Sequence, residues 1–333
     1  MVSMKDIAAA CGVSVATVSK ALSNHSDIGE KTKVQIKKTA ERLGYLPNQS
    51  ARYLRTNRSY NVGVLFADAA GSGLTHDFFS GVLQSLKTAV EAKGYDVTFL
   101  NTTCSGMSYV ERARYRGFDG VAVLGVDFNT PKVQELLRSD LTVITIDYVA
   151  NNLSAVLSDN TNGMTQLMEY LFSQGHTKIA YIYGDGSRVT KQRLAAYYRA
   201  MEERGIIVPS EYVRESLYRD TKQSYRHTEE LLDLKDPPTC IIYPDDVACF
   251  GGMNAIRARG LSIPEDISVA GYDGIRATQY EEPRLTTVWQ NVEEIGEIAA
   301  QTLIEEIERP MTAVPVIHEV KGHLLEGQTV KKL

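Results

Sequence analysis

The stretch GVSVATVSKAL at residues 12–22 decides how the start of the chain folds. Gly12 adopts a positive φ at little cost, which the tight turn between two helices requires. Ser14 is placed to cap the next helix, because its hydroxyl can accept a hydrogen bond from a free N–H of the first turn. With a preceding amphipathic helix over residues 4–11, the pattern predicts a helix-turn-helix.

The second helix of this motif carries side chains that suit the major groove of DNA. Val18 and Leu22 are expected to face the core of the motif. Val15 and Ala16 then lie outside, where they can contact thymine methyl groups, and Lys20 can reach a guanine edge or a phosphate. The alternative is a small helical cap with an exposed valine. The predicted contact residues of this helix are Ser14, Val15, Ala16, Thr17, Ser19 and Lys20.

A third helix is predicted over residues 30–43. Four of its residues are expected to face inward, namely Val34, Ile36, Ala40 and Leu43. Four lysines are expected to form a basic face, namely Lys31, Lys33, Lys37 and Lys38. Such a face is usually only solvated charge, but beside a recognition helix it would contact phosphates.

The segment YLPNQSARYLR at residues 45–55 predicts a turn and then a short helix over 49–55. Pro47 disfavours helix at the residue before it, and Asn48 can cap the helix that follows. Seven residues are too few for a stable helix in water, so a partner helix and DNA would have to order it. Leu54 would then be an apolar wedge for the minor groove. The predicted contact residues are Asn48, Ala51, Arg52, Leu54 and Arg55; the alternative is an ordinary linker.

Charge is distributed unevenly along the chain. Residues 1–58 contain ten Lys or Arg and four Asp or Glu, a net charge of +6, whereas the remainder carries −11. A small basic module on a large acidic body indicates a polyanionic partner for the first part and a different partner for the second.

From residue 61 the pattern changes to apolar strands that alternate with amphipathic helices. Continuous runs of Val, Ile and Leu indicate parallel sheets covered on both faces. The alternation restarts near residue 155, so we expect two similar doubly wound subdomains with a ligand crevice between them. Strands are expected at 61–68, 95–101, 119–125, 142–148, 155–160, 178–186, 239–246, 267–274, 285–291 and near 314–325. Helices are expected at 76–94, 161–174, 190–204, 247–259 and 292–308.

Motif searches argue against several other classes of protein. No GxxxxGK[ST], GxSxG or HExxH motif occurs and the six histidines are dispersed, so we expect no enzyme, cofactor or metal site. No apolar run approaches the ~18 residues of a membrane-spanning helix, and no signal peptide is apparent. We therefore expect a cytoplasmic protein. The cysteines are scattered, which is typical of reduced thiols packed as small hydrophobic side chains. They are Cys11, Cys104, Cys240 and Cys249.

Seven segments together resemble the LacI/GalR family of bacterial transcription repressors. They are MKDIAAACGVSVATVSKALS (4–23), YLPNQSARYL (45–54), SDNTNG (158–163), RLAAYYRAM (193–201), PDDVACFGGMNAI (244–256), LSIPEDISVAGYDG (261–274) and LTTVWQ (285–290), in the family's order. The resemblance covers nearly the whole chain. It implies an α/β fold with a helix-turn-helix DNA-binding head and a periplasmic-binding-protein-like core of two doubly wound parallel-sheet subdomains.

The resemblance also implies how the chain is divided. Residues 1–47 would form the DNA-binding head, 48–60 the hinge helix and linker, and 61–333 the effector-binding core. Within the core, the N-subdomain would comprise about 61–156 and 291–314. The C-subdomain would comprise about 157–288 and 316–333.

A small effector would bind in the cleft between the subdomains. By the resemblance, the cleft residues are Phe79, Asp159, Arg193, Tyr218, Asp245, Asp246 and Asp273. An arginine fork, carboxylates and aromatic faces suit a polyol or sugar, although each carboxylate could instead cap a helix or stabilise a loop. Two departures from the family pattern are RLAAY at 193–197, where a glycine usually follows, and Asp245, where Asn is common. The acidic cleft favours an uncharged sugar or a cationic ligand over a phosphosugar.

As a member of this family, the chain would bind a palindromic operator as a homodimer, with A/T-rich half-sites around a central CpG step. The end of the sequence has no leucine heptad that could join two dimers, so we expect a dimer and not a tetramer. A sugar effector would release the operator. The alternatives are a regulator that needs a corepressor and a cytosolic sugar-binding protein without a DNA function.

The wedge role of Leu54 can be tested directly. Leu54→Ala should weaken binding to a specific operator by about tenfold or more while leaving binding to random DNA unchanged, because only the kinked complex uses the wedge. Fluorescence anisotropy with the two kinds of duplex measures both affinities. Equal losses on both duplexes would contradict the wedge.

Overall fold

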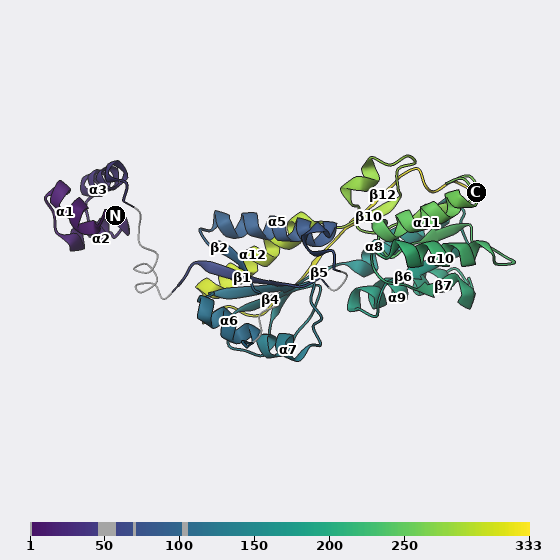
Figure 1. Cartoon of the computed structure of the whole chain (residues 1–333), viewed down its shortest axis with the longest axis horizontal. Coiled ribbons are helices and arrows are strands. Elements are labelled where there is room, and N and C mark those ends of the chain that lie inside the picture. The colour runs from purple at the N-terminus through teal and green to yellow at the C-terminus, as the bar shows by residue number, and fades with distance from the viewer. Residues whose placement is uncertain (1, 46–57, 69–70, 102–105) are drawn as a thin grey trace. The chain divides into compact units, whose positions relative to one another are not determined.

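The first part of the chain folds around three helices, α1 (Met4–Cys11), α2 (Val15–Leu22) and α3 (Glu30–Leu43) (Figure 1). The bounds of α1 and α3 match the prediction, and α2 begins directly after the predicted cap Ser14. The computed structural model describes residues 2–45, 58–68, 71–101 and 106–333. Contacts divide the chain into two units, Met1–Ser59 and Tyr60–Leu333. We call the described part of the first unit the head and the second unit the core.

The core of the head differs from the prediction at the third helix. Ile36 is fully buried, but Val34 is 49% exposed. Lys33 is buried in its place, and its Nζ forms an ion pair with Glu30 at 2.7 Å. The inward face of α3 follows the helical period through residues 33, 36 and 40, and Val34 lies on another side of the helix. The expectations for Val34 and for Lys33 are therefore wrong. They were based on which side chains are apolar, whereas the helical period decides which residues face inward.

Six parallel strands form the sheet of the first lobe of the core, in the order β11-β5-β4-β3-β1-β2. The strands are β1 (Asn61–Phe66), β2 (Asp96–Phe99), β3 (Gly120–Leu124), β4 (Val143–Ile146), β5 (Ser154–Ser158) and β11 (Ile317–Val320). Helices α5 (Asp77–Ala92) and α12 (Val292–Glu308) cover one face, and α6 (Tyr109–Arg116) and α7 (Pro131–Leu137) cover the other. This arrangement confirms the doubly wound parallel sheet.

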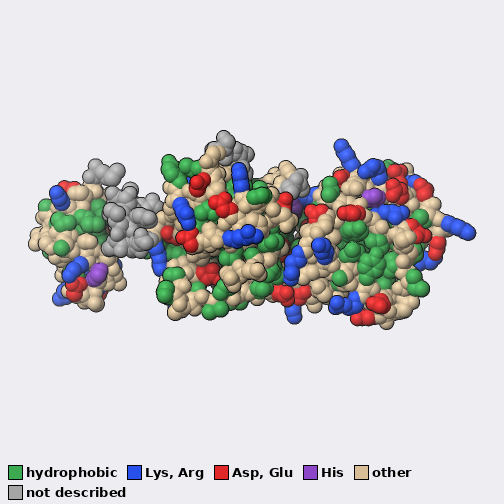
Figure 2. Space-filling view, turned by 90° about the horizontal axis from the view of Figure 1, so that it is seen from below, with side chains coloured by type: hydrophobic (Ala, Val, Ile, Leu, Met, Phe, Trp, Pro, Cys, Tyr) green, Lys and Arg blue, Asp and Glu red, His purple; other side chains and the backbone are tan. Residues whose placement is uncertain are grey.

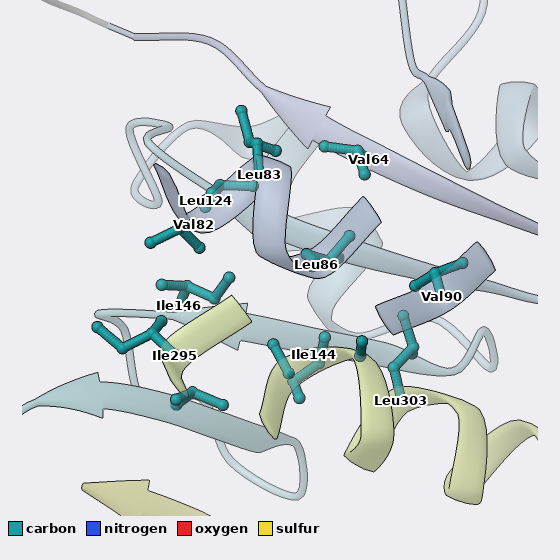
Figure 3. Packing of buried hydrophobic residues seen from close by; sticks show 14 of the residues in the cluster. Val64, Val82, Leu83, Leu86, Val90, Leu124, Ile144, Ile146, Ile295 and Leu303 are labelled. Atoms are coloured by element: carbon teal, nitrogen blue, oxygen red, sulfur yellow. The ribbon is translucent and has the colours of Figure 1, made fainter. Parts of the chain in front are cut away.

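The face under α5 and α12 is a dense apolar layer (Figure 3). Leu86 of α5 and Leu303 of α12 point toward Val64 and Ile144 of the sheet, and all four side chains are fully buried. Because α12 comes from the far end of the chain, this layer joins residues separated by more than 200 positions.

Four parallel strands form the sheet of the second lobe, in the order β7-β6-β8-β9. They are β6 (Ile179–Tyr183), β7 (Val213–Glu215), β8 (Cys240–Ile242) and β9 (Ser268–Ala270). Helices α8 (Asn160–Ser173) and α9 (Arg188–Glu202) pack on one face, and α10 (Thr221–Leu232) and α11 (Asp246–Ala258) on the other. An antiparallel ribbon of β10 (Thr287–Trp289) and β12 (His323–Leu325) packs beside α8. Short 3-10 turns lie at Gly73–Thr75, Ser210–Tyr212 and Arg276–Gln279.

The chain passes between the two lobes three times, after β5, after β10 and after β11. The expected subdomain limits need two changes. β5 continues to Ser158 within the first sheet, and β11 pairs with β5 although residues 316–333 were assigned to the C-subdomain. In addition, β7 and α10 were not predicted. Within the described ranges, no helix is both long enough and apolar enough to span a membrane.

The head offers a matched pair of substitutions. Ile36→Ala should destabilise the head by about 2–4 kcal/mol, because it empties a fully buried site, whereas Val34→Ala should change its stability by less than about 0.5 kcal/mol. Thermal or urea unfolding followed by circular dichroism of residues 1–59 measures both. Similar losses for the two variants would show that Val34 is also a core residue.

Candidate functional site

Helix α2 begins at the residue predicted for its cap. Ser14 Oγ accepts a hydrogen bond from the Thr17 N–H at 3.0 Å, and the two hydroxyls lie 2.8 Å apart. Gly12 has a φ of 66°, so the turn uses the conformation that glycine adopts at low cost. The cap and the turn are therefore confirmed, and they fix where the first turn of α2 points.

The first turn of α2 presents apolar side chains to solvent. Val15 is 42% exposed and Ala16 is exposed, while Thr17 and Ser19 are partly buried. Val18, on the opposite side, is fully buried among Ile7, Ala21 and Ile36. This surface can meet the edges of bases, as a recognition helix requires.

Lys20 does not project freely from α2. Its Nζ lies 2.5 Å from Asp27 Oδ2, in an ion pair that the sequence pattern did not indicate. Basic and acidic side chains stand side by side on the head in Figure 2. The other predicted DNA contacts, Asn48, Ala51, Arg52, Leu54 and Arg55, lie outside the described residues, as does Cys104.

Arg193 of α9 is the centre of the candidate effector site. It is only 3% exposed, and its Nε donates to Asn160 Oδ1 at 2.8 Å while its Nη1 donates to the Pro244 carbonyl at 3.0 Å. Its guanidinium carbon lies 3.5 Å from the centre of the Tyr272 ring. A buried cation of this kind is held by neutral acceptors and by the negative face of an aromatic ring.

Asp273 follows β9 and lies near Arg193. Its Oδ1 accepts a hydrogen bond from Gln290 Nε2 at 2.6 Å, and its backbone has a φ of 108°, in a region that side chains other than glycine rarely adopt. Burial raises the pKa of Asp273 to about 7, with Arg193 acting against the rise and Asp245 adding to it. This carboxyl is therefore poised to change its charge near neutral pH.

Asp245 and Asp246 lie side by side in the sequence but play different parts. Asp245 caps α11, where it accepts from the Ala248 N–H at 2.8 Å and from the Arg219 N–H at 2.6 Å. Asp246 is fully buried and accepts from the Ile275 N–H and the Thr287 hydroxyl. Burial raises the pKa of both carboxyls. In this structure Asp246 supports the loop after β9 and presents no oxygen to a ligand.

The remaining predicted cleft residues lie on both lobes. The Tyr218 hydroxyl lies 2.8 Å from Thr190 Oγ1, and its ring centre is 6.0 Å from the Arg193 guanidinium. Asp159 caps α8 through the Asn162 N–H at 3.0 Å. Phe79 is in the first lobe, where its ring packs against Phe66 and His76. The structure thus gathers Arg193, Tyr218, Asp245 and Asp273, and it places Phe79 in the other lobe.

Three residues of the site were missed by sequence reasoning, namely Asn160, Tyr272 and Arg219. Asn160 stands in the quoted SDNTNG segment and Tyr272 directly precedes Asp273, so position alone could have suggested them. Arg219 has a φ of 60°, and its Nη1 lies 3.1 Å from Asp77 Oδ2 in the first lobe. Nothing in the local sequence indicates that contact.

Two further observations limit the site. A surface cavity of about 540 Å³ beside α7 is lined by other residues, such as Gln134 and Asn151, so it is separate from the predicted effector site. Within the described residues, no group of three or more His, Cys, Asp or Glu is placed to hold a metal ion.

Comparison with known proteins decides the family. The family model of bacterial regulatory proteins, lacI family, matches residues 3–48, and the model of a periplasmic binding protein-like domain matches residues 168–330. The chain is 32% identical over 96% of its length to the Probable HTH-type transcriptional repressor ExuR of Bacillus subtilis, of which it covers 96%. The chain belongs to the LacI family of bacterial regulatory proteins. It is also 29% identical to the HTH-type transcriptional repressor CytR of Escherichia coli, over 92% of this chain and 89% of that protein.

Solved structures agree on the fold. The lac repressor dimer bound to operator and an anti-inducer aligns with a TM-score of 0.80 at 23% identity, over 99% of both chains. A complex of the regulator CelR with cellobiose aligns with a TM-score of 0.71 at 24% identity, over 99% of this chain and 100% of that one. A LacI family regulator of Enterococcus faecium with bound ribose aligns at 0.70 and 25% identity, over 82% of this chain and 99% of the other. The architecture of a helix-turn-helix head and a two-lobed core is that of LacI family regulators.

The raised pKa of Asp273 predicts a dependence of stability on pH. An ordinary aspartate has a pKa near 3.9, so the folded core binds this proton more tightly than the unfolded chain does. The stabilisation is complete below about pH 4 and is lost as the pH rises toward 7. Relative to Asp273→Asn, the wild-type free energy of unfolding should therefore fall between these pH values, as measured by urea titration. Parallel curves for the two proteins would contradict the assignment.

Proposed function

We propose that the chain represses transcription by binding operator DNA through its head, and that a small sugar-like molecule bound in its core releases it. The observation that carries the proposal is the joining in one chain of an exposed recognition helix and a two-lobed core with Arg193 buried among polar groups. The recognition helix is suited to contact base edges, and the polar site around Arg193 is suited to bind a ligand rich in hydroxyls.

The head contributes both shape and charge to DNA binding. Val15 and Ala16 offer methyl groups to thymines, and Lys20 offers a donor. Exposed lysines on α3, namely Lys31, Lys37 and Lys38, would contact phosphates. The contacts proposed for residues 48–55 rest on the sequence pattern and the family resemblance, because these residues lie outside the described ranges. Because phosphate contacts release counterions, the affinity should fall steeply with salt.

The effector site would use Arg193, Asp273 and Asp245 as its hydrogen-bonding groups. Tyr218 and Phe79 would stack against the ligand, and Asp159 completes the set. Two solved members of the fold bind cellobiose and ribose according to their descriptions. The carboxylates would repel a phosphate group, so an uncharged sugar fits better than a phosphosugar.

Arg219 would connect the ligand site in the second lobe to the first lobe, so that ligand binding could change how the two lobes contact each other. Its backbone N–H bonds to Asp245, it directly follows Tyr218, and its guanidinium contacts Asp77 at the start of α5. A ligand that moves Tyr218 or Asp245 would change this contact between lobes. Thermodynamic linkage then requires that DNA change effector affinity by the same factor by which effector changes DNA affinity.

Binding as a homodimer follows from the size of the head. One small head contacts too few base pairs for high specificity, so two heads would read inverted half-sites. The edge strand β2 exposes Phe99 and α6 exposes Tyr115, and such apolar side chains are suited to a contact between copies. A repressor of this kind acts in the bacterial cytoplasm and has no need of enzymatic activity. The second candidate is a regulator that needs its ligand to bind DNA.

Substitution of Arg193 tests the proposal. Arg193→Ala should bind an operator enriched from random DNA with wild-type affinity but should no longer be released by the sugar that releases the wild type. A panel that includes cellobiose and ribose identifies that sugar, with fluorescence anisotropy as the measurement. Arg199→Ala, at an exposed site of the same helix, is the matched control.

Three outcomes would contradict the proposal. If the wild type enriches no DNA sequence, the DNA-binding part is wrong. If the sugar strengthens operator binding, the ligand is a corepressor. If a folded Arg193→Ala core keeps its full response to the sugar, Arg193 does not bind the effector.

A further inference from the structure

The ion pair between Lys20 and Asp27 combines a donor and an acceptor on the surface of the head. Lys20 lies in the last turn of α2, and Asp27 lies in the segment that joins α2 to α3. Their Nζ and Oδ2 atoms are 2.5 Å apart, and both side chains are half exposed. The hydrogen bond from Lys20 lowers the pKa of Asp27, so the carboxylate stays ionised.

This pair faces the same way as the predicted base contacts. Lys20 follows Ala16 by four residues, one turn later on the same side of α2. Because the Asp27 carboxylate contacts the tip of Lys20, it also lies on that side. An acidic side chain is therefore held where DNA is expected to approach, and a simple phosphate-binding surface would not require one.

The chemistry of the pair matches the edge of one kind of base pair. In the major groove, a G·C pair presents the guanine O6 and N7 acceptors beside the cytosine N4 donor. Lysine donates to the former, and a carboxylate accepts from the latter. When adenine replaces guanine, its N6 donor takes the place of the O6 acceptor, and the thymine O4 acceptor takes the place of the cytosine N4 donor. This exchange opposes both side chains, although the purine N7 acceptor remains. An exposed ion pair is weak enough to rearrange and meet these partners.

We propose that Lys20 and Asp27 together read one G·C base pair in each half-site, with Asp27 as the specificity-determining residue for its cytosine. The inference rests on the proposed DNA-binding function and adds a residue to it. Lys20 alone could donate to any group that offers an acceptor, including a phosphate oxygen. Asp27 restricts it, because a carboxylate is repelled wherever no donor is present.

The test compares Asp27→Asn with Glu41→Gln, which removes an equal charge from an exposed site on α3. Each G·C pair of a half-site enriched from random DNA by the wild type is replaced in turn by A·T, and affinities are measured by fluorescence anisotropy at fixed salt. At one position the wild type and Glu41→Gln should prefer G·C by about tenfold or more. Asp27→Asn should lose most of that preference, and Asp27→Glu should restore part of it.

The outcomes separate the inference from the function on which it rests. If Asp27→Asn tightens binding to every duplex by the same factor, Asp27 is only a repulsive charge and the inference is wrong. An enriched half-site without a G·C pair at any α2 contact would overturn it as well. If the wild type enriches no sequence, the proposed function fails and the inference fails with it. Equal melting temperatures of the head variants by circular dichroism confirm that the loss of preference is not unfolding.

Discussion

The buried guanidinium of Arg193 is the constraint on which the arrangement of the second lobe depends. A cation removed from water is tolerated only where acceptors and aromatic faces surround it. Asn160 after β5, the Pro244 carbonyl after β8 and the Tyr272 ring after β9 meet that need from three separate segments. The needs of one side chain therefore fix the relative positions of several loops.

The aspartates near Arg193 divide the remaining tasks between them. Asp245 and Asp246 accept backbone N–H groups, which holds the loops and the start of α11 in place. Asp273 bonds to the side chain of Gln290, and its backbone is held in an unfavourable conformation. Strain of this kind persists only where the surrounding structure enforces it. The site thus combines rigid supports with one carboxyl whose charge responds to its surroundings.

Local signals explain which parts could be predicted from the sequence. The end of α1 follows from Gly12 and the start of α2 from Ser14, and most of the parallel strands follow from their continuous apolar runs. Helix α10 was missed because two of its three buried residues are Ser224 and Thr228, with the Thr228 hydroxyl bonded to Tyr243, so Leu231 alone does not make an apolar period. The contacts of Arg219 and Asp27 were equally hidden, because they join segments whose approach is set by tertiary packing.

The position of β11 and α12 has a consequence for how the molecule is made. Residues near 292–320 supply two parts of the first lobe. They form the edge strand β11 of its sheet and the helix α12, which covers the same face as α5. Translation at ~5–20 residues per second puts roughly 13–52 s between the completion of the head and the completion of this lobe. Most of the second lobe, from α8 to β10, emerges in the interval, and β12 follows it. Each new molecule therefore carries a finished head for some time before it has a complete core.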